Sequence, residues 1–417
     1  MIHDWYRFVL SYPPHLVRDY LVSFDLPKRS AVLDPFCGTG TTLVEAQLNR
    51  YQAFGLEANP FPAFASRVKT NWRSDPDNLE SISQEIADRI SQLLLAEGFD
   101  DFTIGVNSNN HLRRLPVQAE RALINNSISP VPLHKALTLR DEIDKYADTP
   151  EHKYMVLALA KALVTSIGNL RFGPEVGIGR IKADAPVVAA WQSEMRRIIA
   201  DLRQVCSADY SQSIVHSADA RQAASILSPS SIDAVITSPP YPNEKDYTRT
   251  TRLESVILGF YQDMPHIRGF KKSLIRSNTR SVYVADGDDR WIEGNTRIEA
   301  LAREIEERRV ALGKTSGFEK LYPRVTKLYF GGMARHLTEL THVLRPNAQL
   351  AYVVGDQASY LQVMIRTGEI LAEIAEQIGY EVTRIDLFRT RFATATQTDL
   401  REEVVVLKWK GTKKTTK

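Results

Sequence analysis

Acidic residues follow three predicted strands of this 417-residue chain, and glycines follow the first of them. Asp34 ends the short strand "AVL", and Gly38 and Gly40 in the turn "PFCGTG" allow the backbone to bend sharply and approach a ligand closely. An acid here would repel a pyrophosphate but suits a cation, such as the amino group of a methionine moiety. Glu57 and Asp219 end two further strands, where a carboxylate can accept hydrogen bonds from ribose hydroxyls and from an adenine amine. The alternative is a set of surface carboxylates that cap helices.

The elements that must position these acids form an open α/β sheet. Residues 30–60 predict a strand, a glycine turn, a helix and a second strand, which is one βαβ unit with parallel strands. The carboxyl ends of such strands line the usual ligand crevice. The later part of the chain predicts further elements of the same sheet. These are a strand–turn–helix beginning at 213–221, the strand "IDAVI" at 232–236, a helix at 325–344, a turn at 345–348 and a strand at 349–356. A helix at 364–379 and strands at 380–390 and 401–410 follow, and these last strands are expected to be antiparallel.

The strand "IDAVI" ends in an unusual group of residues, Ser238, Pro239, Pro240 and Tyr241. A hydroxyl precedes two prolines, and an aromatic ring follows them. In isolation such a group indicates a strand stop with a Ser-type turn. Its position downstream of the glycine turn, in the same predicted sheet, favours a functional role instead.

Both motifs resemble those of the S-adenosylmethionine-dependent amino-methyltransferases of DNA. Residues 34–40, "DPFCGTG", are similar to motif I of that family, and residues 237–241, "TSPPY", are similar to its catalytic motif IV. Residues 11–21, "SYPPHLVRDYL", resemble motif X, which closes over the methionine part of the cofactor. The resemblance covers about 1–66, 213–260 and 326–410. It implies a Rossmann-like class I methyltransferase sheet, mostly parallel with an antiparallel last strand.

The resemblance implies a cofactor, S-adenosyl-L-methionine, and a direct methyl transfer that needs no metal. An exocyclic amine is a poor nucleophile because its lone pair is delocalised into the ring. The Ser238 hydroxyl and the Pro239 carbonyl can accept both N–H bonds, the prolines fix that carbonyl, and Tyr241 offers a face for a flipped base. The cofactor-binding residues that the resemblance and the strand ends indicate are Tyr12, Pro13, Asp34, Pro35, Phe36, Gly38, Thr39, Gly40, Glu57 and Asp219.

Cysteine content excludes several other chemistries. The chain has only Cys37 and Cys206, too few for a disulfide framework or a cysteine-based zinc site. Cytosine-C5 methylation needs a cysteine nucleophile after the motif IV strand, and neither residue is there, so both are interpreted as packing residues. No run of 18 apolar residues and no signal peptide is found, which predicts a cytoplasmic protein without a membrane partner.

Two insertions interrupt the resemblance. The predicted domains are core parts at 1–73, 209–261 and 326–417, a helical insertion at 74–208 for target recognition, and a basic insertion at 262–325. The net charge of +3 is too small by itself to indicate a nucleic-acid partner. The distribution of the basic residues along the chain is the better indicator. The candidate DNA contacts are Arg268, Lys271, Lys272, Arg276 and Arg280, with a solvated charged loop as the alternative.

The sequence therefore favours methyl transfer to cytosine N4 in duplex DNA by base flipping, with double-stranded DNA and a cognate restriction endonuclease as partners. The serine form of motif IV is found mainly among cytosine-N4 enzymes, whereas adenine-N6 enzymes more often carry Asp or Asn; adenine N6 is the nearest alternative. An RNA guanine-N2 enzyme is disfavoured because the chain begins at motif X. A nicotinamide-dependent oxidoreductase would use the same sheet, but the third glycine of its fingerprint is missing.

Overall fold

The computed structural model describes residues 1–8, 11–101, 112–173, 175–208, 210–243, 245–393 and 397–411. The chain forms two compact units, each built from several segments. The helical unit comprises Met1–Ser11, Asn59–Tyr210 and Tyr247–Phe270, and the sheet unit comprises Tyr12–Ala58, Ser211–Asp246 and Lys271–Lys417. The units of the structure and the domains predicted from the sequence therefore divide the chain at different residues.

The sheet unit is built on seven strands in the order β5-β2-β1-β6-β7-β9-β8. The first five are parallel, and β9, the last strand of the chain, runs antiparallel between β7 and β8. This is the Rossmann-like class I methyltransferase arrangement that the sequence predicts. The strands are β1 (Ala31–Asp34), β2 (Gln52–Leu56), β5 (Ser213–His216), β6 (Ile232–Thr237), β7 (Leu344–Gly355), β8 (Tyr380–Ala393) and β9 (Thr398–Trp409).

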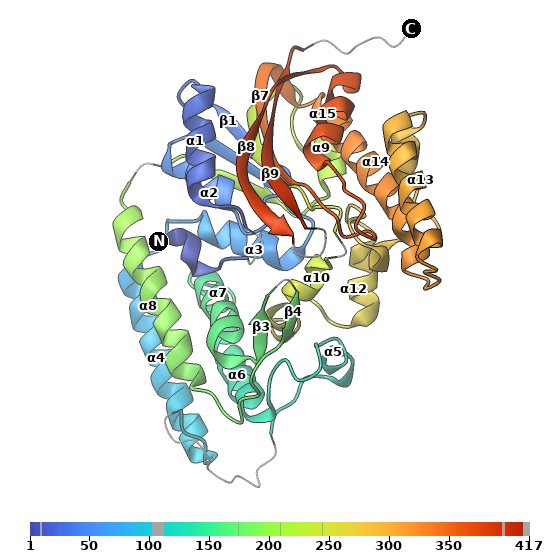
Figure 1. Ribbon diagram of the computed structural model, residues 1–417. Coiled ribbons are helices and arrows are strands. Elements are labelled where there is room, and N and C mark those ends of the chain that lie inside the picture. Colours follow the sequence, from blue (N-terminus) through green and yellow to red (C-terminus); the bar gives the residue numbers. More distant parts are fainter. Residues whose placement is uncertain are drawn as a thin grey trace. The chain divides into compact units, whose positions relative to one another are not determined.

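Helices cover both faces of this sheet (Figure 1). Ala234 and Ile236 of β6 pack with α1 and α2, while Val235 between them packs with α14 and α15 on the other face. Successive strand side chains point to opposite faces, so a strand covered on both sides must be apolar throughout. The helices of the unit are α1 (Pro14–Phe24), α2 (Thr41–Leu48), α9 (Ala223–Ile226), α13 (Thr296–Ala311), α14 (Tyr322–Leu340) and α15 (Thr367–Ile378), with 3-10 turns at Ala220–Gln222, Thr279–Ser281, Asp288–Ile292 and Glu319–Leu321.

One local expectation is wrong. The turn expected at 345–348 lies inside β7 as a bulge: the register slips between the pairs Ile232–Leu344 and Ala234–Gln349, and Asn347 takes a φ of 70°. The basic insertion contains a 16-residue helix, α13, that was not predicted from the sequence. The Asn295 side chain caps this helix by accepting from the backbone N–H of Ile298 at 3.1 Å.

The helical unit centres on α7 (His152–Ala162), which is apolar nearly all round. Residues 154–160 are buried, as the sequence predicts. Helices α4 (Pro76–Ala96) and α8 (Val187–Val205) lie side by side within this unit (Figure 1). Its other elements are α3 (Pro60–Lys69), α5 (Val117–Glu120), α6 (Pro130–Ile143), α10 (Tyr247–Thr250), α11 (Arg252–Ile257), α12 (Met264–Lys271), the 3-10 turns Ile2–Trp5 and Asp144–Tyr146, the π turn Leu163–Ile167, and the two-stranded sheet of β3 (Leu170–Phe172) and β4 (Val176–Ile178).

Membrane insertion by a helix has no support in the described parts of the chain. None of the helices there is both long and apolar enough to cross a bilayer.

Two adjacent glycines of α14 give a test of packing in the sheet unit. A Cβ on Gly331 would overlap the carbonyl oxygen of Asp288 and lie 2.9 Å from the backbone nitrogen of Asp289, whereas a Cβ on Gly332 would meet side-chain atoms no closer than 3.4 Å. We expect Gly331→Ala to lower the free energy of unfolding by roughly 1–3 kcal/mol, the usual cost of overpacking. Gly332→Ala should leave it unchanged or raise it, because alanine favours the helix. Denaturant unfolding of the two variants checks this, and equal midpoints would contradict the packing described.

Candidate active site at the carboxyl ends of the parallel strands

The glycine turn joins β1 to α2 and is fixed by backbone hydrogen bonds. The N–H of Cys37 donates to Leu56 at 3.1 Å, and the N–H of Gly40 donates to Cys37 at 2.7 Å. Gly38 and Gly40 have φ angles of 50° and 84°, in the left-handed region that favours glycine. The turn therefore needs both glycines to reach the start of α2.

A third glycine, which the sequence argument missed, comes from the neighbouring strand. A Cβ on Gly55 of β2 would lie 2.8 Å from both the Cys37 sulfur and a Leu43 methyl. Gly55 thus lets β2 pack closely against the turn and α2. A glycine inside an otherwise apolar strand is the sequence signal that marks such an approach. Cys37 is buried in this contact, in agreement with its interpretation as a packing residue.

Asp34 is fully buried at the end of β1 and accepts hydrogen bonds from three separate segments. Its Oδ1 accepts from the Thr237 hydroxyl at 2.6 Å and from the Phe36 N–H at 3.1 Å. Its Oδ2 accepts from the Tyr12 hydroxyl at 3.0 Å. Burial raises the pKa of Asp34 to about 6, against the lowering effect of these hydrogen bonds. Asp34 therefore joins the segment before α1, the glycine turn and the end of β6 to one another.

Tyr12 and Pro13 lie where the N-terminal segment meets the sheet. The Tyr12 hydroxyl also bonds the hydroxyl of Thr42 in α2, and Thr42 donates to the carbonyl of Ile236 at 3.0 Å. Pro13 is the extended residue that precedes α1. Burial, followed by the charge of Asp34, raises the pKa of Tyr12 well above its ordinary value, so the phenol remains a donor.

The three predicted acids lie on adjacent strand ends, because β1, β2 and β5 are neighbours. Glu57 is half-buried, and its Oε2 accepts from the Gly38 N–H at 2.9 Å, so it braces the glycine turn. Asp219 is bound by Arg221, whose Nε lies 3.0 Å from each carboxylate oxygen. The sequence argument did not anticipate this ion pair. A contact between Asp219 and an adenine amine stays a prediction.

Residues 238–241, which are predicted to belong to motif IV, follow β6 directly. The Ser238 hydroxyl donates to the carbonyl of Val353 in β7 at 3.0 Å. A hydroxyl has one proton and two lone pairs, so this bond uses the donor and leaves Ser238 as an acceptor. Pro239 is buried and Pro240 is half-buried. The ring of Tyr241 lies against Gly355, where an added Cβ would be 3.1 Å from its Cε2 atom.

His336 and Tyr352, two residues that the sequence argument missed, support the Phe36 ring. It makes an edge-on contact with His336 of α14, with centroids 4.8 Å apart. His336 bonds the carbonyl of Ala220 at 3.1 Å and the hydroxyl of Tyr352 at 2.7 Å. Burial lowers the pKa of His336 to about 4, so the ring is neutral near pH 7. Neither residue was a candidate site residue, and their place in the sheet unit brings them to this site.

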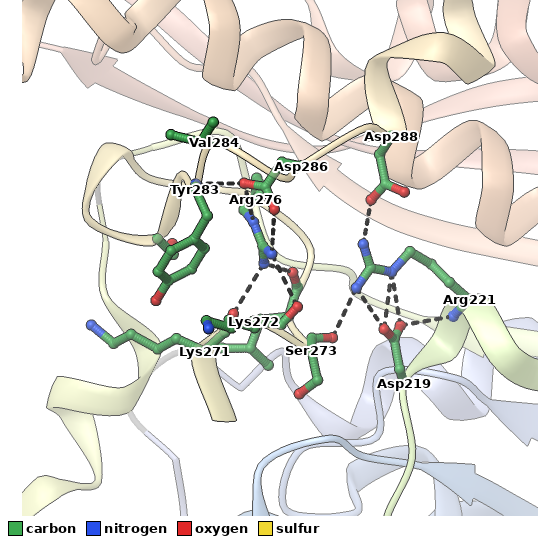
Figure 2. A network of polar contacts seen from close by, with 12 residues as sticks. Asp219, Arg221, Lys271, Lys272, Ser273, Arg276, Tyr283, Val284, Asp286 and Asp288 are labelled. Carbon is green, nitrogen blue, oxygen red and sulfur yellow. Dashed lines mark hydrogen bonds and ion pairs between the residues drawn. The ribbon is translucent and has the colours of Figure 1, made fainter. Parts of the chain in front are cut away.

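The candidate DNA-binding cations differ in what they contact (Figure 2). Arg276 is buried and donates to Asp286 from Nε at 2.8 Å and from Nη2 at 2.7 Å. Lys271 forms an ion pair with Asp246. Lys272 and Arg280 are exposed, and the Lys272 ammonium lies 5.7 Å from the Tyr283 ring centroid. Arg268 is exposed on α12 in the helical unit, so the run is divided between the two units. Contact with DNA stays a prediction for all five.

The site offers groups that suit S-adenosyl-L-methionine. Thr39 is 2% exposed, and its hydroxyl has no hydrogen-bond partner among the residues that the structure describes. A buried hydroxyl is normally paired, so Thr39 fits a site for a polar ligand. The sequence predicts that the Asp34 carboxylate binds the amino group of a methionine moiety. In the structure this carboxylate is enclosed by protein and already accepts three hydrogen bonds. Its direct contact with a methionine amine therefore remains a prediction, while its structural role is clear.

Comparison with known proteins yields similar enzymes but no match to a family model. The chain is 24% identical to the Type II methyltransferase M.BsoBI of Geobacillus stearothermophilus over 434 residues, which cover 95% of this chain and 82% of that protein. It is 33% identical to the Type II methyltransferase M.AvaI, from Nostoc sp. and from Anabaena variabilis, over 175 residues. That match covers 40% of this chain and 34% of M.AvaI. These homologues are Type II methyltransferases.

Thr39 and Thr42 form a matched pair that separates ligand binding from folding. Thr39→Val removes a hydroxyl without an observed partner, so stability should not fall, while S-adenosylmethionine affinity should fall roughly two- to tenfold for one lost hydrogen bond. Thr42→Val removes a buried hydroxyl that donates to the Ile236 carbonyl and should lower the free energy of unfolding by about 1–3 kcal/mol. Calorimetric titration and thermal unfolding measure the two effects. Unchanged affinity in a folded Thr39→Val variant would remove Thr39 from the binding site.

The raised pKa of Asp34 predicts a specific pH dependence of stability. Between pH 3.8 and about 6, the native state holds a proton that the unfolded state has released. The stabilising contribution is therefore complete below pH 3.8 and is lost as pH rises through about 6. The free energy of unfolding of the wild type, minus that of Asp34→Asn, should decrease by roughly 2–2.5 kcal/mol from pH 4 to pH 7, at about 1.4 kcal/mol per pKa unit. Denaturant titrations at both pH values check this, and a constant difference would refute it.

Proposed function

We propose that the protein is a DNA methyltransferase that transfers a methyl group from S-adenosyl-L-methionine to the N4 amine of cytosine in duplex DNA. Similarity to Type II methyltransferases along nearly the whole chain supports methyl transfer to DNA. The methyltransferase sheet and the residues at its carboxyl ends support the cofactor. The type designation of the relatives also supports a cognate restriction endonuclease as a partner.

The orientation of Ser238 is the observation that carries the chemistry. Its proton is used by the Val353 carbonyl, so its lone pairs can accept from an N–H of the target amine. The Pro239 carbonyl would accept the second N–H. Withdrawing both N–H bonds from the ring plane frees the nitrogen lone pair for attack. When bound, the cofactor would supply an electrophilic methyl group on a sulfonium. Its carbon–sulfur bond would break as the nitrogen–carbon bond forms, so that the sulfur leaves as a neutral thioether, and the methylated amine would release one proton to solvent. The chain therefore needs to supply position more than acid or base strength.

Tyr241 is proposed to hold the flipped base. One side of its ring packs against Gly355. The residue is only half-buried, so part of the ring remains accessible for stacking. Stacking on an aromatic ring does not depend on the identity of the base. The choice between cytosine N4 and adenine N6 therefore rests on the serine in motif IV.

Mass spectrometry of nucleosides tests the assignment directly. Duplex DNA is incubated with the protein and S-adenosylmethionine that carries a labelled methyl group, and the DNA is then digested. N4-methylcytosine is the expected product. N6-methyladenine would keep the enzyme class but overturn the base assignment, and the absence of labelled nucleosides under conditions of cofactor binding would overturn the proposal.

Ser238→Ala and Tyr241→Ala should impair different steps. Loss of one preorganised group at the reacting atom should lower the single-turnover rate roughly a hundredfold in Ser238→Ala, with cofactor affinity nearly unchanged. Tyr241→Ala should also weaken capture of the flipped base by about 1–3 kcal/mol. A mismatch opposite the target lowers the cost of flipping, so it should rescue Tyr241→Ala more than Ser238→Ala.

Ser231→Ala is the matched control for this experiment. Ser231 precedes the same strand and its hydroxyl also donates to a carbonyl, that of Ser228, at 2.6 Å. The control should react at the wild-type rate. If Ser238→Ala did so too, Ser238 would be a turn residue only.

A further inference from the structure

A loop of the sheet unit, residues 282–287, presents an apolar side chain to solvent. Val284 is 94% exposed, and Ala285 beside it is also exposed. A single exposed apolar residue needs no explanation by itself. This one differs because the loop that carries it is held in one conformation.

Three charged side chains hold the loop, and Figure 2 shows two of them, Arg276 and Asp286. Asp286 accepts from the Tyr283 N–H at 2.7 Å, and Arg276 donates to both of its carboxylate oxygens. Arg324 donates to the carbonyls of Tyr283 and Val284, each at 3.2 Å. Burial alone would raise the pKa of Asp286, but the hydrogen bonds from Arg276 and Tyr283 outweigh it and keep the pKa below its ordinary value. The loop is therefore preorganised, with Val284 at its exposed turn.

The surroundings of the loop favour a polyanion. Lys272 and Arg280 are exposed, and both Lys272 and Arg276 lie over the Tyr283 ring, at 5.7 and 5.3 Å from its centroid. Two acids of the same segment are paired with cations, Asp286 with Arg276 and Asp288 with Arg221, whereas the neighbouring Asp289 has no ion pair among the described residues. These pairs reduce the repulsion that a phosphate backbone would meet, while the exposed cations attract it.

The same segment is tied to the candidate active site. The carbonyl of Ser277 accepts from the Asn243 N–H at 3.1 Å, and the Asn278 amide donates to the carbonyl of Lys245 at 3.0 Å. Asn243 and Lys245 follow motif IV within a few residues. On the other side, Arg221 donates to the carbonyl of Ser273 at 2.9 Å while it binds Asp219. The loop is thus attached to both the motif IV segment and a cofactor-side acid.

We infer that Val284 is an apolar wedge that contacts the base stack of duplex DNA near the target base, while Lys272 and Arg280 contact phosphates. The inference rests on the proposed DNA methyltransferase function. Proteins that distort DNA commonly insert an apolar side chain between base steps. A flipped base leaves a gap in the stack, and a rigid loop can place such a side chain without an ordering cost at binding.

Val284 and Val22 provide matched variants for the test. Val22 lies on α1 of the same unit and is 79% exposed, but it lies outside the segment that carries the loop. Val284→Ala should weaken binding of duplex DNA roughly tenfold, and Val284→Asp should weaken it more, because a carboxylate would lose its water on entering the base stack of a polyanion. Val22→Ala and Val22→Asp should bind as the wild type does. All four variants should retain the thermal midpoint and the S-adenosylmethionine affinity of the wild type.

The salt dependence of binding distinguishes the wedge from a phosphate contact. Lys272→Gln should reduce the slope of log affinity against log salt by about 1, whereas Val284→Ala should leave the slope unchanged. A fluorescent base analogue at the target should show less unstacking with Val284→Ala than with Val22→Ala. If the Val284 and Val22 variants behave alike while the wild type methylates DNA, the wedge is refuted and the proposed function stands. If the wild type transfers no methyl group to DNA, the proposed function fails and the wedge fails with it.

Discussion

The buried carboxylate of Asp34 is the interaction on which the candidate active site depends. A carboxyl group without solvent must be satisfied by donors, and here these come from Tyr12, Phe36 and Thr237. The three donors belong to three segments that are distant in sequence. They can reach one acid only if the N-terminal segment, the glycine turn and the end of β6 converge. Ser238 follows Thr237 directly, so the position of the proposed acceptor is set by this convergence.

The register of β1, β6 and β7 also sets the position of Ser238. Leu33 pairs with Val235, and Thr237 pairs with Tyr352, so the ends of β1, β6 and β7 lie side by side. This alignment brings the Val353 carbonyl to the Ser238 hydroxyl. A register slip of one residue in β6 would move its side chains to the opposite faces of the sheet. It would also move the Ser238 acceptor away from the site. The chemistry proposed for Ser238 is therefore a property of the sheet as much as of the motif.

Patterns local in sequence could be predicted, whereas partners distant in sequence could not. Glycines after a short strand and acids at strand ends predicted the βαβ unit and the adjacent positions of Asp34 and Glu57. The helix α13 was missed because its many charges resembled a solvated insertion, although Ile298, Leu301 and Ile305 recur at helical spacing on its buried face. The charge of Arg276 was evident, but its burial against Asp286 depends on a chain reversal that composition does not reveal.

Buried ion pairs in the basic insertion are better explained by conformation than by stability. Removing Arg276 and Asp286 from water costs free energy that their attraction only partly returns, so such pairs contribute little net stability. Their hydrogen bonds instead select one arrangement of residues 283–286. Arg221 acts in the same way between Asp219 and Asp288. Arg221 bonds both Asp219 and Asp288, so one guanidinium sets the geometry of Asp219 and that of the exposed loop. Neither can rearrange without losing part of its bonding.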